Sequence, residues 1–277
     1  MTTMPRAARA KPPIAILTDF GYRDHYAGAI KGVIAAIAPG AQIIDITHGI
    51  PAQSIAAGAL ALRESWHYFP PKTIFLAVVD PGVGTARLPI AIETRAGARF
   101  VGPDNGLLAP AAGDAGIARV VRLSSRRYRL KTVSATFHGR DVFAPAAAWL
   151  WRGASIGSFG PRLGGITRLD LPKPAVSRRQ IRGEVIYVDG FGNLVTNIGR
   201  EIIASMKATF PASRLWVRID RGAAMEIFAT YGDAPTGASV ATFGSFEFLE
   251  IAVRDGNAAE RFAASPGAPV IVTATGK

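Results

Sequence analysis

Short apolar segments alternate with helical segments through the first half of the chain, and three of these apolar segments lead into an aspartate. The expected strands are residues 14–17, 43–46 and 73–79. Asp19 and Asp80 follow the first and third of these segments, and Asp45 lies near the end of the second. The segments between them, 26–38 and 54–68, have the apolar spacing of helices. Because strands that alternate with helices run parallel, we predict a mostly parallel sheet with helices on both faces.

The second half of the chain has a different pattern. A Leu-Pro-Lys-Pro stretch at 171–174 is typical of a stiff linker, and short strands with glycine turns follow it. The expected strands are 183–188, 194–198, 215–219, 225–229, 238–243, 248–253 and 270–273. One short helix, 257–262, interrupts them. This pattern predicts a small antiparallel barrel or sandwich.

A chain of 277 residues can bury the cores of two domains. Two more strands, 90–92 and 99–101, and a helix at 142–151 are expected in the first half. The predicted organisation is a disordered tail, an N-terminal α/β domain and a C-terminal antiparallel β domain. Their bounds are 1–13, 14–172 and 181–277.

Charge and composition exclude several function classes. The net charge of +12 would suit an anionic partner such as nucleic acid, but the basic residues are scattered, which favours a solvated basic surface. Without cysteine the chain forms no disulfide, no thiolate zinc site and no cysteine nucleophile. No segment resembles a signal peptide or a bilayer span, so we expect a cytoplasmic protein that binds no membrane.

The segment after the third expected strand carries the clearest sign of chemistry. Asp80 ends the strand, a Pro-Gly turn follows at once, and Arg87 comes shortly after the turn. Ligands of α/β folds bind in the crevice outside the carboxyl ends of the strands, where helices do not cover the sheet. Asp80 is therefore poorly placed for a core and well placed for a binding or catalytic site.

The other strand-end acids have two interpretations that the sequence leaves open. A carboxylate at a strand tip, such as Asp19, can accept hydrogen bonds from a ribose diol. Alternatively, Asp19 or Asp24 caps the helix that begins near residue 26 by accepting its free amide hydrogens. For Asp45, structural hydrogen bonding is the favoured interpretation.

Two further segments combine polar residues with glycine. His138 precedes Gly139 at a loop-to-helix junction, where glycine permits close approach of a ligand and histidine can move a proton near neutral pH. Asp141 is expected to cap the helix that follows. Residues 189–197 form a hairpin with a polar tip, which is either an ordinary glycine turn or, through the Asn193 amide, an adenine contact.

Common catalytic signatures are absent from the sequence. It has no Walker A loop, no G-x-S-x-G elbow and no H-E-x-x-H motif. The glycines at 82 and 84 lack the third glycine of a dinucleotide fingerprint, so a nicotinamide cofactor is not indicated.

Six segments, taken in order, resemble the S-adenosylmethionine hydroxide adenosyltransferase family, whose relatives include the fluorinases and chlorinases. They are LTDFG (17–21), DPGVGT (80–85), GPDNG (102–106), TFHGRD (136–141), DGFGN (189–193) and LEIAV (249–253). Each is weak alone, but six in register over residues 14 to about 260 are specific.

The resemblance implies a C-terminal β-barrel and a homotrimer with active sites between subunits. It implies that water or hydroxide attacks C5′ of S-adenosyl-L-methionine (SAM), which releases adenosine and L-methionine without a cofactor or a metal. The implied catalytic residues are Asp80, Arg87 and His138. The implied substrate-binding residues are Asp19, Asp24, Phe137, Asp189, Asn193, Tyr231 and Ser245.

The matching positions carry individual roles over from the family. Asp19 would hold the ribose hydroxyls. Asp24 and Asp189 would neutralise the methionyl ammonium, and Ser245 would bind the carboxylate. Asn193 would contact adenine, with Tyr231 stacked on it.

The chemistry of the three catalytic candidates predicts a different role for each. Arg87 stays protonated, so it can stabilise a forming hydroxide but cannot act as a base. His138 is the expected proton acceptor, and Asp80 would orient Arg87 or His138 and balance the charge.

The sequence leaves three alternatives to hydrolysis. The halogenating relatives have a hydroxyl-bearing residue in place of Gly139, an aromatic one in place of Asp80 and an extra loop before residue 102, all of which disfavours halogenation here. A SAM- or adenosine-binding protein without turnover would not need the catalytic set. An RNA-binding module would need interleaved aromatic and basic residues, for which 215–218 is a poor match.

Overall fold

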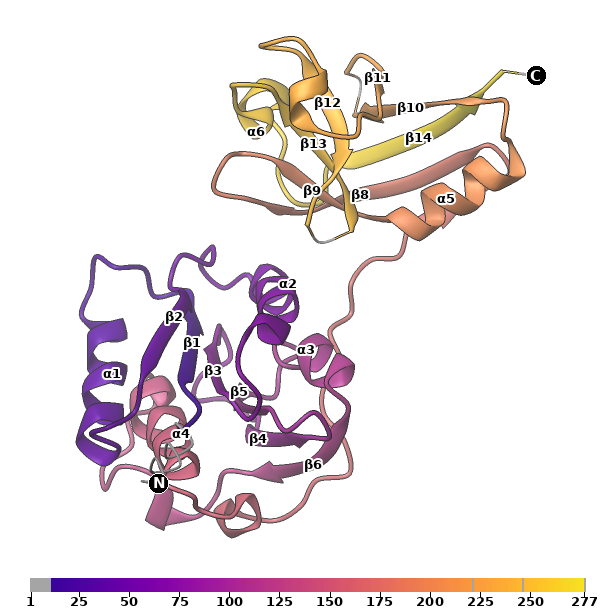
Figure 1. Cartoon of the computed structure of the whole chain (residues 1–277). Helices are drawn as coiled ribbons and strands as arrows, with labels where there is room; N and C mark the ends of the chain where they lie inside the picture. Colours follow the sequence, from indigo (N-terminus) through magenta and orange to yellow (C-terminus); the bar gives the residue numbers. More distant parts are fainter. Residues whose placement is uncertain (1–10, 221, 246, 277) are drawn as a thin grey trace, which may run out of the picture. The chain divides into compact units, whose positions relative to one another are not determined.

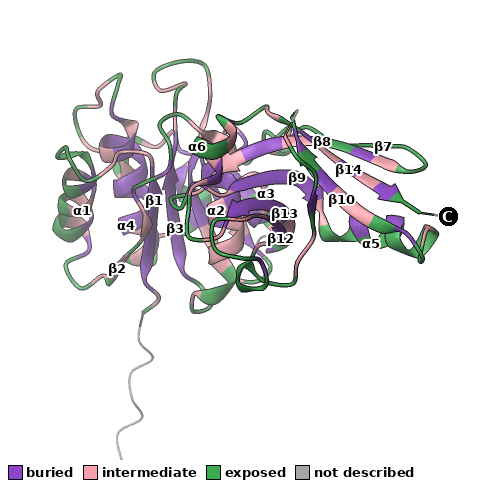
Figure 2. Cartoon of the chain, turned by 90° about the horizontal axis from the view of Figure 1, so that it is seen from above, coloured by how far each residue is buried: buried purple, intermediate pink, exposed green. Residues whose placement is uncertain are grey.

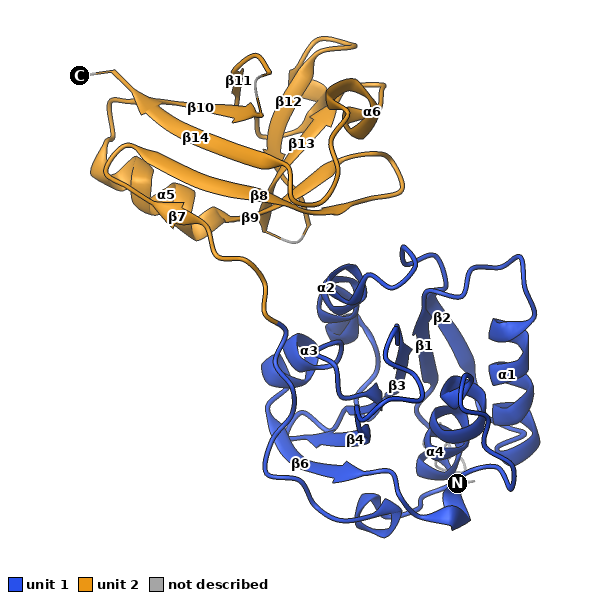
Figure 3. Ribbon diagram, turned by 180° about the vertical axis from the view of Figure 1, so that it is seen from behind, with its two compact units in different colours: residues 1–169 blue, residues 170–277 orange. Residues whose placement is uncertain are grey.

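The computed structural model describes residues 11–220, 222–245 and 247–276, and the chain divides into two compact units (Figures 1 and 3). Unit 1 is Met1–Leu169 and unit 2 is Asp170–Lys277. Most of the predicted tail, residues 1–10, lies outside the described residues. The remainder contacts unit 1, where the Trp151 indole N–H donates to the Pro12 carbonyl at 2.9 Å.

Unit 1 is built on a six-stranded sheet with the order β2-β1-β3-β5-β4-β6. The strands are β1 (Ile14–Thr18), β2 (Ile43–Thr47), β3 (Ile74–Val78), β4 (Pro89–Thr94), β5 (Arg99–Pro103) and β6 (Ile117–Arg122). The pairs β2-β1, β1-β3 and β3-β5 are parallel, whereas β4 is antiparallel to both of its neighbours. The predicted mostly parallel sheet is therefore confirmed.

Helices cover both faces of this sheet, as predicted. They are α1 (Tyr26–Ile37), α2 (Ile55–Ser65), α3 (Ala109–Asp114) and α4 (Ala144–Trp151). On one face, Ile14 and Ile16 of β1 share a core with Ile30 of α1 and with residues of α4. On the other face, Gly58 of α2 packs closely against Leu17 of β1. The central strands are accordingly buried along their whole length (Figure 2).

The chain reverses its direction of winding at β1, which lies between β2 and β3. Thr18 at the end of β1 pairs with Val78 at the end of β3, so the two carboxyl ends are adjacent. Such a switch point leaves a crevice that helices do not cover. Asp19 and Asp80 follow these two strand ends.

The predicted helix at 142–151 begins earlier than expected. A π-helical turn, Gly139–Phe143, precedes α4. Its first turn starts directly after His138. Single π-helical turns are rare in proteins overall, but those that occur often lie at functional sites.

Unit 2 is an antiparallel, nearly closed barrel-like sheet of eight strands with the order β11-β10-β14-β8-β9-β13-β12, and β7 pairs with β8. The strands are β7 (Ala175–Val176), β8 (Gln180–Val188), β9 (Leu194–Gly199), β10 (Arg214–Ile219), β11 (Met225–Glu226), β12 (Ser239–Phe243), β13 (Phe248–Val253) and β14 (Pro269–Thr275). An isolated bridge between Ile227 and Ala241 joins the two edges. The predicted C-terminal barrel is confirmed.

One expectation for unit 2 was wrong. We expected a single short helix, which is present as α6 (Ala258–Phe262), but α5 (Arg200–Thr209) is a second helix among the described residues. It covers the barrel because Ile203 and Met206 on one face are buried, while most of its polar residues are exposed. None of the helices among the described residues is long and apolar enough to cross a membrane.

Candidate active site

A cavity of about 710 Å³ in unit 1 opens at the carboxyl ends of β1 and β3. Its walls come from the turn after β1, the start of α1, the loop after β3 and the loop before α4. The side chains used below that line it are Asp19, Phe20, Tyr26, Gln53, Asp80, Val83, Phe137, His138 and Arg140. Four predicted site residues thus line one cavity, although they are far apart in the sequence.

Asp80 and Arg87 form a closed ion pair beside the cavity. Arg87 Nε donates to both Asp80 carboxylate oxygens at 2.9 and 3.0 Å, and Arg87 Nη2 donates to Oδ2 at 2.5 Å. The two side chains are only 5% and 8% exposed. Backbone turns at Val83 and Thr85 fold the chain back so that Arg87 meets the acid. This fork geometry fixes the guanidinium plane.

His138 completes a line of three groups. Arg87 Nη2 lies 2.8 Å from His138 Nδ1. Because a guanidinium only donates, Nδ1 accepts, and the neutral ring carries its proton on Nε2. Burial, and then the charge of Arg87, lower the pKa of His138 below its ordinary value, although Asp80 opposes the shift. The imidazole is therefore neutral at pH 7.

The loops that carry these groups are in direct contact. Gly84 has a φ of +79°, and a Cβ placed there would lie 2.6 Å from the Ala135 carbonyl oxygen. Only glycine allows both this conformation and this approach. The Asp80 loop is thus held against the loop that leads to His138.

Asp141 does not cap a helix, contrary to expectation. It lies inside the π-helical turn, is fully buried, and accepts hydrogen bonds from Arg140 at 2.6 and 2.9 Å and from the Ser134 N–H at 2.8 Å. Burial alone would raise the pKa of Asp141, but these hydrogen bonds outweigh it and hold the pKa below its ordinary value. The carboxylate therefore anchors the loop before His138.

Asp19 lines the cavity, whereas Asp24 does not. The first residue of α1 is preceded by His25, and no side chain caps the helix by a hydrogen bond, so neither acid acts as the cap that the sequence allowed. Asp19 Oδ2 instead accepts from the Gln53 N–H at 2.8 Å. Asp24 is exposed and is absent from the cavity wall.

Three aromatic rings form one wall of the cavity. The Phe137 ring lies 5.8 Å from Phe20 and 5.2 Å from Tyr26 between centroids, both in edge-on geometry. Of these rings, only Phe137 is among the substrate-binding residues that the resemblance implies. The roles of Phe20 and Gln53 were missed, because their positions depend on the turn after β1 and on the positive φ of 66° at Gln53.

The GPDNG segment supports the end of β3 from the neighbouring strand. Asn105 Nδ2 donates to the Val79 carbonyl at 2.9 Å, directly before Asp80. The resemblance marked this segment without giving it a function. Its asparagine lies behind the site and positions the strand end.

Two of the predicted residues of unit 2, Asp189 and Asn193, lie in the hairpin between β8 and β9. Asp189 accepts from the N–H groups of Phe191 and Asn193, both at 2.8 Å, and from Asn193 Nδ2 at 2.9 Å. The hairpin tip is therefore a turn closed by its own carboxylate, and Asn193 has its amide oxygen left for another partner. Ser245 is exposed in a turn after β12.

Glu250 is a buried acid of unit 2 to which the sequence assigned no role. The Tyr231 hydroxyl donates to Glu250 Oε2 at 2.6 Å, and the acid is only 4% exposed. Burial raises the pKa of Glu250, the Tyr231 hydrogen bond opposes this shift, and the charge of Asp189 adds to it. Asp189, Tyr231 and Glu250 thus form one electrostatic cluster.

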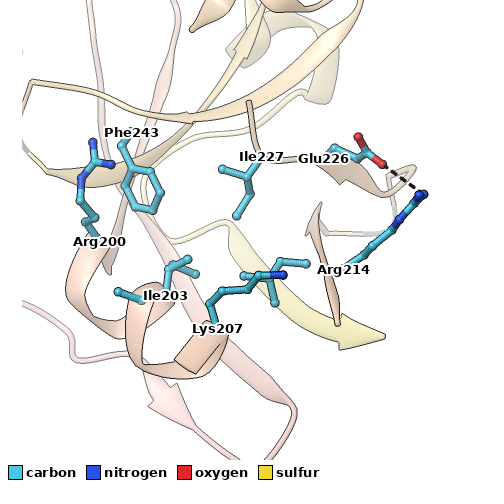
Figure 4. Close-up of a pocket in the computed structure, with 9 residues that line it drawn as sticks. Arg200, Ile203, Lys207, Arg214, Glu226, Ile227 and Phe243 are labelled. Carbon is cyan, nitrogen blue, oxygen red and sulfur yellow. Dashed lines mark ion pairs between the residues drawn. The ribbon is translucent and has the colours of Figure 1, made fainter. Parts of the chain in front are cut away.

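Unit 2 also has a cavity of about 660 Å³ between α5 and strands β10 to β12 (Figure 4). Its cationic side chains already have partners. Arg200 pairs with Glu247, Lys207 Nζ donates to the Ser213 carbonyl at 2.6 Å, and Arg214 lies 3.9 Å from Glu226. None of the predicted site residues lines it, so the candidate active site is the cavity of unit 1.

Metal binding has no candidate in the part of the chain that the structure describes. The described residues contain no group of three or more histidine and carboxylate side chains close enough to hold a metal ion.

Comparison with known proteins identifies the family. The model of the SAM hydroxide adenosyltransferase N-terminal domain matches residues 14–160, and the C-terminal domain model matches residues 183–271. The chain belongs to the SAM hydroxide adenosyltransferase family. The two matches fall within unit 1 and unit 2, respectively.

Similar proteins cover almost the whole chain. The (R)-S-adenosyl-L-methionine hydrolase of Salinispora tropica is 39% identical over 267 residues, which are 95% of this chain and 98% of that protein. An uncharacterized conserved protein of Thermotoga maritima has a crystal structure with a TM-score of 0.84 and 38% identity, covering 94% of this chain and 99% of that one. A fluorinase of an Actinoplanes species is more distant, with 28% identity over 70% of this chain and 74% of its own.

Proposed function

We propose that this chain hydrolyses SAM to adenosine and L-methionine by attack of water at C5′ of the ribose. The observation that carries the proposal is the line Asp80–Arg87–His138 beside a cavity that Asp19 also lines. The relatives named as SAM hydrolases, at 38–39% identity over most of the chain, support the same reaction.

The reaction depends on activation of the attacking water, and the leaving group does not need to be protonated. A C5′–O bond forms as the C5′–S bond breaks, and the electron pair of that bond stays on sulfur, so methionine leaves as a neutral thioether. One proton of the attacking water must be removed. SAM is the substrate, and the proposed displacement draws on no cofactor.

The three catalytic groups act together on the water. Arg87 lies behind Asp80 and His138 and stabilises the forming hydroxide electrostatically. His138 takes the proton, which requires that Nδ1 be released from Arg87 when substrate and water are bound. Asp80 orients Arg87 and balances the second positive charge that appears on His138. Alignment of water, C5′ and sulfur in a water-poor cavity supplies much of the remaining acceleration.

We propose substrate contacts for residues of unit 1 and for residues of unit 2. Asp19 accepts the ribose hydroxyls, and the aromatic wall that includes Phe137 covers an apolar or sulfonium part of SAM. Asp24 and Asp189 neutralise the methionyl ammonium, and Ser245 binds its carboxylate. Asn193 contacts adenine through its remaining amide oxygen, and Tyr231 stacks on the base.

We also propose a cytoplasmic homotrimer with active sites between subunits. The resemblance is the support for this assembly.

Halogenation is disfavoured at Gly139. A Cβ at this position would lie 3.2 Å from Ile30 Cδ1 and 3.4 Å from the rings of Phe137 and Phe20. A hydroxyl-bearing residue, as in the halogenating relatives, would therefore require the Ile30 side chain to shift by a few tenths of an ångström and would press against the two rings.

The decisive experiment is incubation with SAM in ¹⁸O-labelled water. Hydrolysis at C5′ places the label in the 5′-hydroxyl of adenosine and releases unlabelled methionine. Adenosine without label would contradict the mechanism, and binding of SAM without release of methionine would support a non-catalytic binding protein instead.

A further inference from the structure

His48, at the end of β2, is a fully buried histidine that the proposed mechanism does not use. Its Nδ1 lies 2.7 Å from the Thr18 hydroxyl at the end of β1. Its Nε2 lies 3.3 Å from Asp45 Oδ1, and the other oxygen of Asp45 accepts from Lys31 Nζ at 2.6 Å. A chain of polar groups thus runs from the exposed Lys31–Asp45 pair to the carboxyl end of β1.

The neighbour of Nε2 indicates the direction of the Thr18–His48 hydrogen bond. Because the Asp45 carboxylate only accepts, the proton of the neutral ring belongs on Nε2, 3.3 Å from Asp45 Oδ1, and Nδ1 accepts from the Thr18 hydroxyl, whose oxygen also accepts from the Phe20 N–H at 3.2 Å. A histidine that accepts at Nδ1 carries its proton on Nε2, which lies toward Asp45. Burial lowers the pKa of His48, although the charge of Asp45 opposes the shift, so the ring is neutral as this pattern requires.

The backbone after His48 holds the same turn from the other side. The His48 carbonyl accepts from the Gly21 N–H at 2.7 Å, and the Ile50 N–H donates to the Thr18 carbonyl at 3.4 Å. The Gln53 N–H donates to the Asp19 carboxylate. The Thr18–Gly21 turn is therefore tied at several points to the segment that begins at His48.

Asp19 and Phe20 are the two residues of this turn that line the cavity. Neither touches His48 through its own side chain in any hydrogen bond or ring contact of the described residues. The imidazole acts on them through Thr18, whose hydroxyl bridges the ring and the Phe20 N–H.

We propose that His48 is a positioning residue of the ribose site: by holding the Thr18 hydroxyl, it sets the place of the Asp19 carboxylate and of the Phe20 ring. The proposal rests on the proposed function in one respect, namely that the ligand of Asp19 is the ribose diol. It assigns to a buried histidine a role in substrate selection rather than in proton transfer.

The test compares two ligands that differ only at the diol, adenosine and 2′,3′-dideoxyadenosine, by calorimetric titration of the full chain. For the unmodified protein we expect adenosine to bind at least about tenfold more tightly, since a hydroxyl pair on a carboxylate is a charge-assisted interaction. His48→Ala should reduce this preference to about threefold or less, because the turn loses the tie through Thr18 and Asp19 is then held by fewer contacts.

Two other variants separate positioning from simple stability. An asparagine side chain places an amide oxygen near the former Nδ1, so His48→Asn should retain most of the preference for adenosine. Thr18→Val removes the hydroxyl and keeps the β-branched shape, so it should lose the preference as His48→Ala does, even if the alanine variant does not fold. Ile34→Val, in the core under α1, is the control that lowers stability without moving the preference.

The possible results are distinct. Folded His48→Ala or Thr18→Val protein with the unmodified preference for adenosine would overturn the role of His48. Unmodified protein that neither hydrolyses SAM nor distinguishes the two nucleosides would contradict the proposed function, and this inference with it. Loss of preference in both variants, with retention in His48→Asn, would support it.

Discussion

The polar groups of unit 1 and those of unit 2 are assembled in different ways. In unit 1, Asp80 and Arg87 are almost fully buried and bind each other, and Arg87 also contacts His138 from a separate loop. In unit 2, Asp189 binds residues of its own turn, and Tyr231 is 41% exposed. Buried, prearranged charges suit the stabilisation of a reacting group, whereas exposed groups on a turn suit recognition. We therefore expect unit 1 variants to change turnover and unit 2 variants to change binding.

The largest expected effect is that of His138→Ala. Loss of the proton acceptor should lower kcat by roughly two to four powers of ten, with the dissociation constant of SAM nearly unchanged. Single-turnover kinetics and calorimetric titration measure the two quantities. The exposed His67, changed to alanine, is the matched control and should be fully active. Full activity of His138→Ala would remove this residue from the mechanism.

Arg87→Lys should have the next largest effect. Lysine keeps the charge but cannot form the fork with Asp80 and reach His138 together, so kcat should fall by about 10²-fold, as for loss of one preorganised donor. The control is Arg63→Lys, because Arg63 pairs with Asp114 on the surface of the same unit. Equal activity of the two variants would mean that the fork geometry is irrelevant to turnover.

The pH dependence of kcat tests the state of His138. Because a base acts in its neutral form and the pKa of His138 is lowered, activity should persist below the ordinary histidine pKa of 6.5. Further acidification should reduce kcat about tenfold per pH unit. Asp80→Asn removes a charge that raises this pKa, so the residual activity should decline at still lower pH. A decline that begins above pH 6.5 would contradict the assignment.

Asp189→Asn should weaken substrate binding and leave turnover nearly unchanged, the reverse of His138→Ala. Removal of the charge should raise KM for SAM about tenfold, because a charge-assisted contact to the ammonium is lost, while kcat changes less than about threefold. The asparagine oxygen can still accept from the N–H groups of Phe191 and Asn193, which both donate to Asp189 Oδ1, and only the bond from Asn193 Nδ2 is lost. Asp255→Asn is the control in the same unit, since Asp255 is exposed and asparagine tolerates its φ of +56°. A fall in kcat as large as that of His138→Ala would contradict the expectation that unit 2 variants change binding rather than turnover.

The sequence predicted more of the scaffold than of the site. The alternating strands and helices of unit 1 were predictable because apolar periodicity is local, and so was the turn at Asp189 and Asn193. Helix α5 was not, because its apolar face, with Ile203 and Met206, is short and directly follows a strand.

The arrangement of the site depends on contacts that no local pattern contains. The resemblance grouped Asp80, Arg87 and His138, but it left open whether Asp80 orients the arginine or the histidine. In the structure Asp80 binds Arg87, because the turns after β3 return the chain to its own strand end. Likewise, Asp141 was expected to cap a helix, and only the π-helical turn reveals that it anchors the loop before His138.

Tyr231→Phe should have the smallest effect on function. It separates the role of the Tyr231 ring in binding from the role of its hydroxyl in the stability of unit 2. The ring remains for stacking, so KM should change less than about threefold, but buried Glu250 loses its donor, which should cost about 1 kcal/mol of stability. The pH dependence of this loss of stability follows from the raised pKa of Glu250. Below that pKa the carboxyl group is protonated, so loss of the hydrogen bond costs less. Above it, the buried carboxylate lacks its donor, so the loss costs more. The urea midpoint of the variant should therefore fall further below that of the unmodified protein at pH 8 than at pH 4.5, the ordinary glutamate pKa, whereas Tyr68→Phe, 82% exposed, should match it at both. An equal loss at both pH values would mean that the hydroxyl stabilises the barrel without reference to the charge of Glu250.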